Sequence, residues 1–138
     1  MQLTRRETMA LGLGAAIITV LPFRANAATE DLIAEFTGGA DMAETGITLT
    51  APEIAENGNT VPIEVDAAGA AAIMVLAAGN PTPPVATFNF GPLAAEQRAA
   101  TRVRLAGTQD VIAIAKMEDG SFARASKTVK VTIGGCGG

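Results

Sequence analysis

The sequence contains no histidine, no tryptophan and no tyrosine, and it has one cysteine among 138 residues. Without histidine the chain has no Ser-His-Asp triad, no Cys-His pair and no imidazole metal ligand. A single cysteine excludes an internal disulfide, a four-cysteine zinc site and a CxxC redox pair. Positive charge is also scarce, because 10 Lys and Arg stand against 14 Asp and Glu. The net charge of −4 argues against a nucleic-acid partner. The available chemistry is that of carboxylates, hydroxyls, the backbone and one thiol.

Residues 1–27 have the layout of an export signal. The pair Arg5-Arg6 precedes an apolar run from Ala10 to Leu21, and Ala25-Asn26-Ala27 follows as a small-x-small cleavage site. A membrane-spanning helix needs about 20 apolar residues, and this run has only 12. We therefore expect a removable signal rather than a membrane anchor. The arginine pair predicts the twin-arginine route and a periplasmic location.

Cleavage after residue 27 of 138 leaves 111 residues. Three Arg and one Glu are lost with the signal, so 7 basic residues face 13 acidic ones and the net charge becomes −6. We expect one small acidic domain with no membrane attachment, in an oxidising compartment. A lone cysteine in such a compartment either pairs between chains or remains chemically active.

One short helix is predicted at the start of the mature chain, over residues 29–36. Thr29 is placed to cap it, and Glu30 and Asp31 fall in its first turn, where the helix dipole favours acidic side chains. Gly38-Gly39 is expected to end the helix, since glycine is the usual residue just past a helix C-terminus.

Beyond the helix, short apolar segments alternate with turns. Strands are predicted at residues 47–50, 61–65, 71–78, 85–90, 100–105, 111–117 and 122–133. The run Ala71–Ala78 fits a strand buried on both faces, with a short buried helix as the competing interpretation. Because Pro62 has no N–H, its end of the strand is expected at an edge or bulge. In the last strand Val129, Val131 and Ile133 are expected to face the core.

About seven short strands with little helix are typical of an all-β fold. We predict an immunoglobulin-like β-sandwich over residues 28–133. About 110 residues bury a sufficient core without disulfides.

The last five residues, 134–138, read Gly-Gly-Cys-Gly-Gly. Glycine loses the most conformational entropy on ordering, so we expect a flexible arm that reaches roughly 15 Å when fully extended. No bulky side chain flanks Cys136, so the tip can enter a narrow pocket of another protein. We interpret Cys136 as a thiol that takes a covalent adduct and carries it between partner active sites. The four arm glycines are Gly134, Gly135, Gly137 and Gly138. Upstream, Lys127 and Lys130 either attract an anionic adduct or form a solvated strand face.

The terminal motif, the twin-arginine signal and the segment Pro52–Pro62 (PEIAENGNTVP) together resemble SoxY. SoxY is the sulfur-carrying subunit of the periplasmic thiosulfate-oxidising Sox system. The stretches 101–104 and 111–120 resemble the same family, so the likeness extends from the signal to the last residue.

The resemblance implies a fold, a set of partners and a role for the arm. The fold is an immunoglobulin-like sandwich that pairs with SoxZ, another small β-sandwich, as a heterodimer. SoxAX, a c-type haem enzyme, joins thiosulfate oxidatively to the terminal cysteine as an S-thiosulfonate. SoxB, a manganese-dependent hydrolase, releases sulfate, and SoxCD oxidises the remaining sulfane sulfur where it is present. Cys136 matches the carrier cysteine and its four glycine neighbours match the arm. The implied protein is a carrier, not an enzyme, with no cofactor beyond the covalent sulfur adduct.

Three other interpretations remain open at this point. A ubiquitin-like sulfur carrier also ends in Gly-Gly, but it acts in the cytoplasm and does not need the cysteine. A periplasmic binding module would use Cys136 only for an interchain disulfide, giving a disulfide-linked dimer. A stand-alone hydrolase would use acids such as Asp110 or Asp119, although no pair stands in a recognisable catalytic context. Substituting Cys136→Ser separates these, because only the carrier loses all sulfur transfer.

Overall fold

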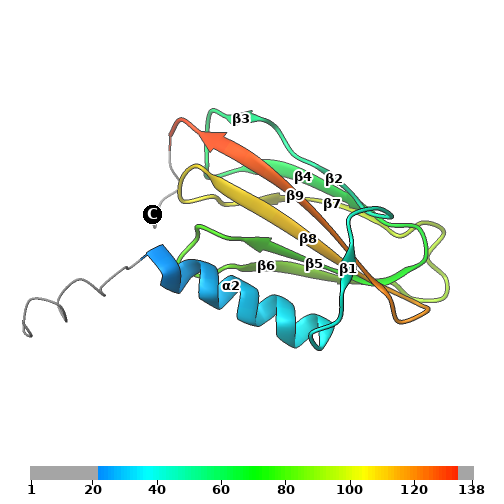
Figure 1. Ribbon diagram of the computed structural model, residues 1–138. Coiled ribbons are helices and arrows are strands. Elements are labelled where there is room, and N and C mark those ends of the chain that lie inside the picture. Colours follow the sequence, from blue (N-terminus) through cyan, green and yellow to red (C-terminus); the bar gives the residue numbers. More distant parts are fainter. Residues whose placement is uncertain (1–21, 134–138) are drawn as a thin grey trace, which may run out of the picture.

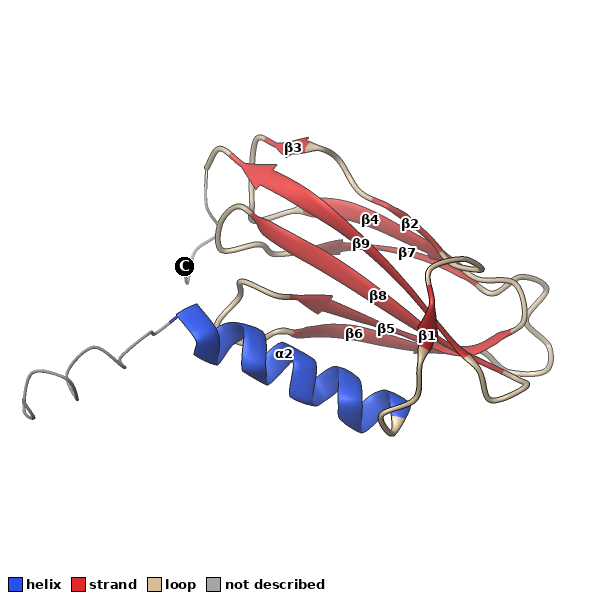
Figure 2. Ribbon diagram, viewed as in Figure 1, coloured by secondary structure: helices blue, strands red, loops and turns tan. Residues whose placement is uncertain are grey.

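The computed structural model describes residues 22–133, with side chains described from residue 27 onward. Most of the predicted signal and the predicted arm, residues 134–138, lie outside the described residues. The described chain forms one helix followed by nine strands in two sheets (Figures 1 and 2). The helix is α2, Pro22–Thr37. The strands are β1 (Met42–Ala43), β2 (Thr48–Thr50), β3 (Ile54–Ala55), β4 (Val61–Asp66), β5 (Ala70–Ala77), β6 (Pro84–Asn89), β7 (Arg98–Val103), β8 (Gln109–Met117) and β9 (Phe122–Val131).

The two sheets confirm the predicted all-β sandwich. The larger sheet has the order β1-β9-β8-β5-β6, with β3 also beside β9, and the smaller sheet has the order β2-β4-β7. β1 and β3 run parallel to β9, and every other pair is antiparallel. The seven longer strands lie within a few residues of their predicted positions. The two-residue strands β1 and β3 were not predicted, because two residues are too few to show an alternating pattern.

The main core lies between the two sheets. Val61, Ile63 and Val65 of β4 are 0%, 3% and 1% exposed, so these alternate residues share the inner face of the sheet. Ile73 and Val75 of β5 belong to the same buried cluster. The hydrophobic effect acting on this inner layer holds the sandwich together without a disulfide.

Helix α2 covers the outer face of the larger sheet (Figure 2). Ile33 packs in a second buried cluster with Met74 and Leu76 of β5 and Ile114 of β8. Phe36 contacts Phe122 edge-to-face, with ring centroids 6.1 Å apart. The run that begins at Ala70 is therefore a strand buried on both faces, and the competing helical interpretation is wrong.

The beginning of the helix differs from the prediction. Helix α2 starts at Pro22, so Thr29 lies inside it, 2% exposed, rather than capping its end. No acidic residue falls in the first turn. Proline is well tolerated in the first turn of a helix, and the alanines that follow favour helix. The C-terminus was predicted correctly, since Gly38 and Gly39 have φ of 67° and 82° and end the helix. Cleavage after Ala27 would remove six of the sixteen helical residues.

The end of β9 also departs from the prediction. Val129 is fully buried, but Val131 is only partly buried and Ile133 is 66% exposed. The strand stops at Val131, so the alternation no longer directs Ile133 toward the core. The expectation for Pro62 is confirmed: β2 pairs with β4 only from Glu64 to Asp66, which leaves Pro62 beyond the reach of that neighbour.

Candidate functional site

Cys136 and its four glycine neighbours lie outside the described residues. The nearest described part is the point where the chain leaves the sandwich, at Ile133. We call this region the arm base and define it as the end of β9 with the two segments bonded to it, residues 53–60 and 104–109. In Figure 1 the end of β9 and the start of α2 lie at the same end of the sandwich.

Strand β3 holds the end of β9. The Lys130 N–H donates to the Glu53 carbonyl at 2.9 Å, and the Thr132 N–H donates to the Ala55 carbonyl at 3.1 Å. The Thr132 hydroxyl also donates to the Glu56 carbonyl at 3.2 Å. The chain is thereby held to the sandwich as far as residue 132.

A glycine connects the end of β9 to the end of β7. The Gly58 N–H donates to the Ile133 carbonyl at 2.8 Å, and the Gly58 carbonyl accepts from the Leu105 N–H at 2.7 Å. Gly58 is buried and follows Asn57, whose side-chain oxygen accepts from the Asn59 N–H at 3.0 Å. The Thr60 N–H donates to the Asn57 carbonyl at 3.4 Å, so residues 57–60 form a turn that also bridges the two strand ends.

A buried glutamine organises the adjoining loops. Gln109 is 8% exposed; its side-chain oxygen accepts from the Gly79 N–H at 2.9 Å. Its Nε2 donates to Asn80 Oδ1 at 2.8 Å and to the Gly107 carbonyl at 3.0 Å. A Cβ on Gly79 would lie 2.9 Å from Gln109 Cβ, so this approach requires glycine.

Asn80 extends the same network. It accepts from the Ala106 N–H at 2.9 Å and donates to the Arg104 carbonyl at 2.8 Å. No sequence pattern indicated the network, because it joins residues about 30 positions apart. It fixes the loop after β5 against the loop before β8, which belongs to the arm base.

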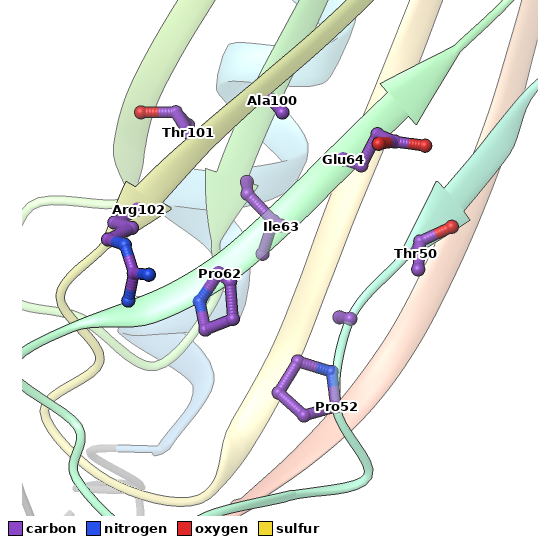
Figure 3. Close-up of a pocket in the computed structure, with 9 residues that line it drawn as sticks. Thr50, Pro52, Pro62, Ile63, Glu64, Ala100, Thr101 and Arg102 are labelled. Atoms are coloured by element: carbon purple, nitrogen blue, oxygen red, sulfur yellow. The ribbon is translucent and has the colours of Figure 1, made fainter.

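The outer face of the smaller sheet carries a groove of about 630 Å³ (Figure 3). It lies where the chain leaves β2, so both ends of the segment Pro52–Pro62 contribute to it. Its lining residues are Thr50, Ala51, Pro52, Pro62, Ile63, Glu64, Ala100, Thr101 and Arg102. Within this segment the structure shows the short strand β3, which pairs with β9, and a turn at residues 57–60.

The arginines of β7 have different surroundings. Arg98 forms an ion pair with Glu64 at 2.6 Å, and the hydrogen bond to Glu64 raises the pKa of Arg98. Arg102, on the same face, instead donates to the Thr60 hydroxyl at 3.4 Å. Arg102, and Arg104 just beyond the end of β7, are both exposed.

The lysines upstream of the arm lie on β9. Lys127 is exposed opposite Val111 of β8, well before the strand ends. Lys130 is exposed opposite Ile54 of β3, close to the arm base.

The two acids considered for a hydrolase do not form a site together. Asp110 lies at the start of β8 and accepts from the Thr128 hydroxyl at 2.5 Å. Asp119 lies in the turn after β8, where Ser121 donates to it from its hydroxyl at 2.6 Å and from its N–H at 2.8 Å. The Ser121 hydroxyl is the main cause that lowers the pKa of Asp119. At about 3.3 Å per residue of strand, the two acids are separated by more than ~20 Å.

Among residues 22–133, no group of three or more Cys, Asp or Glu side chains could hold a metal ion. No helix in this part of the chain is long and apolar enough to cross a membrane. Every described side-chain nitrogen or oxygen that is buried has a hydrogen-bond partner.

Comparisons with known proteins identify a family that matches this chain. The model of the family described as sulfur oxidation protein SoxY matches residues 33–136. The sulfur carrier protein SoxY from Chlorobium limicola f thiosulfatophilum is 34% identical, and the match covers 78% of this chain and 99% of that one, with a TM-score of 0.68. No curated protein sequence matches the chain.

More distant structures show the fold alone. A superoxide reductase (neelaredoxin) from Ignicoccus hospitalis is 19% identical, with a TM-score of 0.56 over 63% of this chain and 80% of that one. A hypothetical protein from Pyrococcus horikoshii is 12% identical, with a TM-score of 0.52 over 69% of this chain and 99% of that one.

Proposed function

Because the chain belongs to the SoxY family of sulfur oxidation proteins, we propose that it is a covalent sulfur carrier whose adduct is borne by Cys136. The observation that carries the proposal is the family match, which extends to residue 136 and so includes the only cysteine of the chain. Cys136 follows three residues after Ile133, whose carbonyl is bonded to Gly58. The chain is thus fixed to the sandwich up to three residues before Cys136.

The chemistry requires a thiolate and partner enzymes. Oxidative loading joins the Cys136 sulfur to the outer sulfur of thiosulfate, and two electrons pass to an acceptor, for which we propose a SoxAX-type haem enzyme. The product is an S-thiosulfonate. Water then attacks its terminal sulfonate sulfur, in a SoxB-type hydrolase, and releases sulfate and two protons while a persulfide stays on Cys136. A SoxCD-type enzyme, where the host has one, oxidises that sulfane sulfur.

The carrier itself needs no catalytic group or cofactor. We propose Gly134, Gly135, Gly137 and Gly138 as the arm that lets Cys136 enter each partner in turn. The further elements of the proposal are a heterodimer with a SoxZ-like β-sandwich, export by the twin-arginine route and action in the periplasm. Weak docking to each enzyme suits a carrier that has to move on.

The test is the intact mass of the mature protein from cells growing on thiosulfate, measured before and after treatment with a reductant. The carrier is expected to show a reducible mass excess of thiosulfonate or sulfane size. A Cys136→Ser variant, which keeps the sandwich unchanged, should show none. A plain thiol, or only a disulfide-linked dimer, during active thiosulfate oxidation would instead favour the binding module.

A further inference from the structure

Two exposed arginines lie beside the point where the arm begins. Leu105, the residue after Arg104, donates its N–H to Gly58, and Gly58 donates to the Ile133 carbonyl. The Arg102 guanidinium reaches the hydroxyl of Thr60, two residues after Gly58. Tertiary pairing thus brings the end of β7 against the end of β9, although about 30 residues separate them in sequence.

Arg102, near the end of β7, and Arg104, just beyond it, differ from Arg98 at the start of the strand. Arg98 is neutralised by Glu64 at 2.6 Å. Within residues 27–133, neither Arg102 nor Arg104 has a carboxylate oxygen within ion-pairing distance, since the ion pairs there join Arg98 to Glu64 and Arg124 to Glu30. In a chain with a net charge of −4, two cations that are not ion-paired and stand two residues apart create a local attraction for anions.

The covalent reach of the chain matches this position. Cys136 is three residues beyond Ile133, which allows up to roughly 10 Å of extension, and the cysteine side chain with a thiosulfonate adds several ångströms. The hydrogen bonds through Gly58 and Thr60 place the Arg102 guanidinium within roughly 15 Å of the Ile133 carbonyl, from covalent dimensions. An adduct on Cys136 can therefore contact this cation.

We propose that Arg102 and Arg104 form an anion-recognition site on the carrier body for the sulfonate end of the adduct on Cys136 and for the anionic sulfur compound that loads it. The planar guanidinium presents several N–H donors to sulfonate oxygens. The inference rests on the proposed carrier function of Cys136. It gives a function to two side chains that are not buried in the fold: Arg102 near the end of β7 and Arg104 just beyond it.

Tetrathionate tests the site without any partner enzyme. The Cys136 thiolate attacks one of its two inner sulfurs, a Cys–S–S bond forms, and the central S–S bond breaks. Thiosulfate leaves with the electron pair, the thiosulfonate remains on Cys136, and the proton of the thiol goes to the buffer. The rate is read as intact mass against time, with the neutral bis(2-hydroxyethyl) disulfide as the parallel reagent.

Arg102→Ala and Arg104→Ala are each expected to slow loading by tetrathionate about 2- to 5-fold at low ionic strength, as for an exposed charge at several ångströms in water. The difference should vanish near 1 M salt, where the screening length is about 3 Å. Arg98→Ala removes the same formal charge from the same face and should change the rate less than about 2-fold. Glu56→Gln removes a negative charge beside Gly58 and should speed loading.

The reaction with the neutral disulfide separates recognition from thiol reactivity. All four variants should react with it at the rate of the unmodified protein. Equal slowing by Arg98→Ala, no slowing by either arginine variant, or equal slowing with the neutral reagent would overturn the inference. Absence of an adduct in thiosulfate-grown cells would overturn the carrier function instead, and the tetrathionate rates would still decide whether the arginines recognise anions.

Discussion

The side chain of Gln109 is predicted to be the main polar support of the loops beside the arm base. In Gln109→Ala, one hydrogen bond from Gly79 and two to Asn80 and Gly107 are lost. A net contribution of about 1 kcal/mol for each hydrogen bond gives an expected loss of roughly 2–3 kcal/mol. Gly79 is exposed and water can reach its N–H, so the full cost of a buried unsatisfied donor does not apply there.

Gln97→Ala is a matched control for the same substitution. Gln97 accepts one hydrogen bond, from the exposed Gly69 N–H at 3.3 Å, so its loss should cost about 0.5 kcal/mol or less. Urea denaturation followed by far-ultraviolet circular dichroism is the appropriate assay, since the chain has no Trp or Tyr. The melting temperature of Gln109→Ala should fall by about 10 °C.

Comparing the two variants tests whether the hydrogen-bond network of Gln109 stabilises the fold. A loss below about 1 kcal/mol for Gln109→Ala, or equal losses for both variants, would show that the network contributes little. A changed m-value would show that the substitution altered the unfolded state or the cooperativity of unfolding instead.

Three further predictions follow from particular residues. Ile114→Ala should cost about 2–4 kcal/mol in urea denaturation, since that side chain is fully buried, whereas Ile133→Ala should stay within about 0.5 kcal/mol; equal effects would contradict the assigned burial. Gly120→Ala should cost about 1–2 kcal/mol, because φ is 88° there and Cβ is strained in that region, and a neutral result in the same assay would be inconsistent with the turn geometry. Ser121→Ala should raise the pKa of Asp119 toward its ordinary value of 3.8, measured by NMR titration. The hydrogen bonds from Ser121 lower the folded-state pKa of Asp119, so they stabilise the folded protein while that carboxyl is ionised. This stabilisation is present above the unfolded pKa and is lost as the pH falls through the folded pKa. Ser121→Ala should therefore lose less stability than the unmodified protein when the pH is lowered below 3.8.

The local sequence pattern was sufficient to predict the β-sandwich and to single out Cys136 as the candidate thiol. The alternation of Val61, Ile63 and Val65 identified an inner face because side chains of a strand point alternately to its two sides. The unbroken apolar run of β5 indicated burial on both faces, and α2 supplies the second cover. The choice of Cys136 needed no folding at all, since it is the only cysteine and stands between glycines. The start of α2 and the exposure of Ile133 were missed, because both depend on where an element begins or stops.

The surroundings of the arm base depended on tertiary structure alone. The Thr132 hydroxyl bonds to the carbonyl of Glu56 across 76 residues, and Gly58 joins strand ends that share no sequence signal. In the sequence, the basic residues nearest to Cys136 are Lys127 and Lys130. The fold also brings Arg102 and Arg104 to the arm base. The sequence could not show this neighbourhood, because the period-two alternation of side chains is the same for every strand and does not tell which strands are adjacent. The sequence shows by itself which face of a strand is buried, whereas strand order and pairing register decide which residues meet at the end of the sandwich.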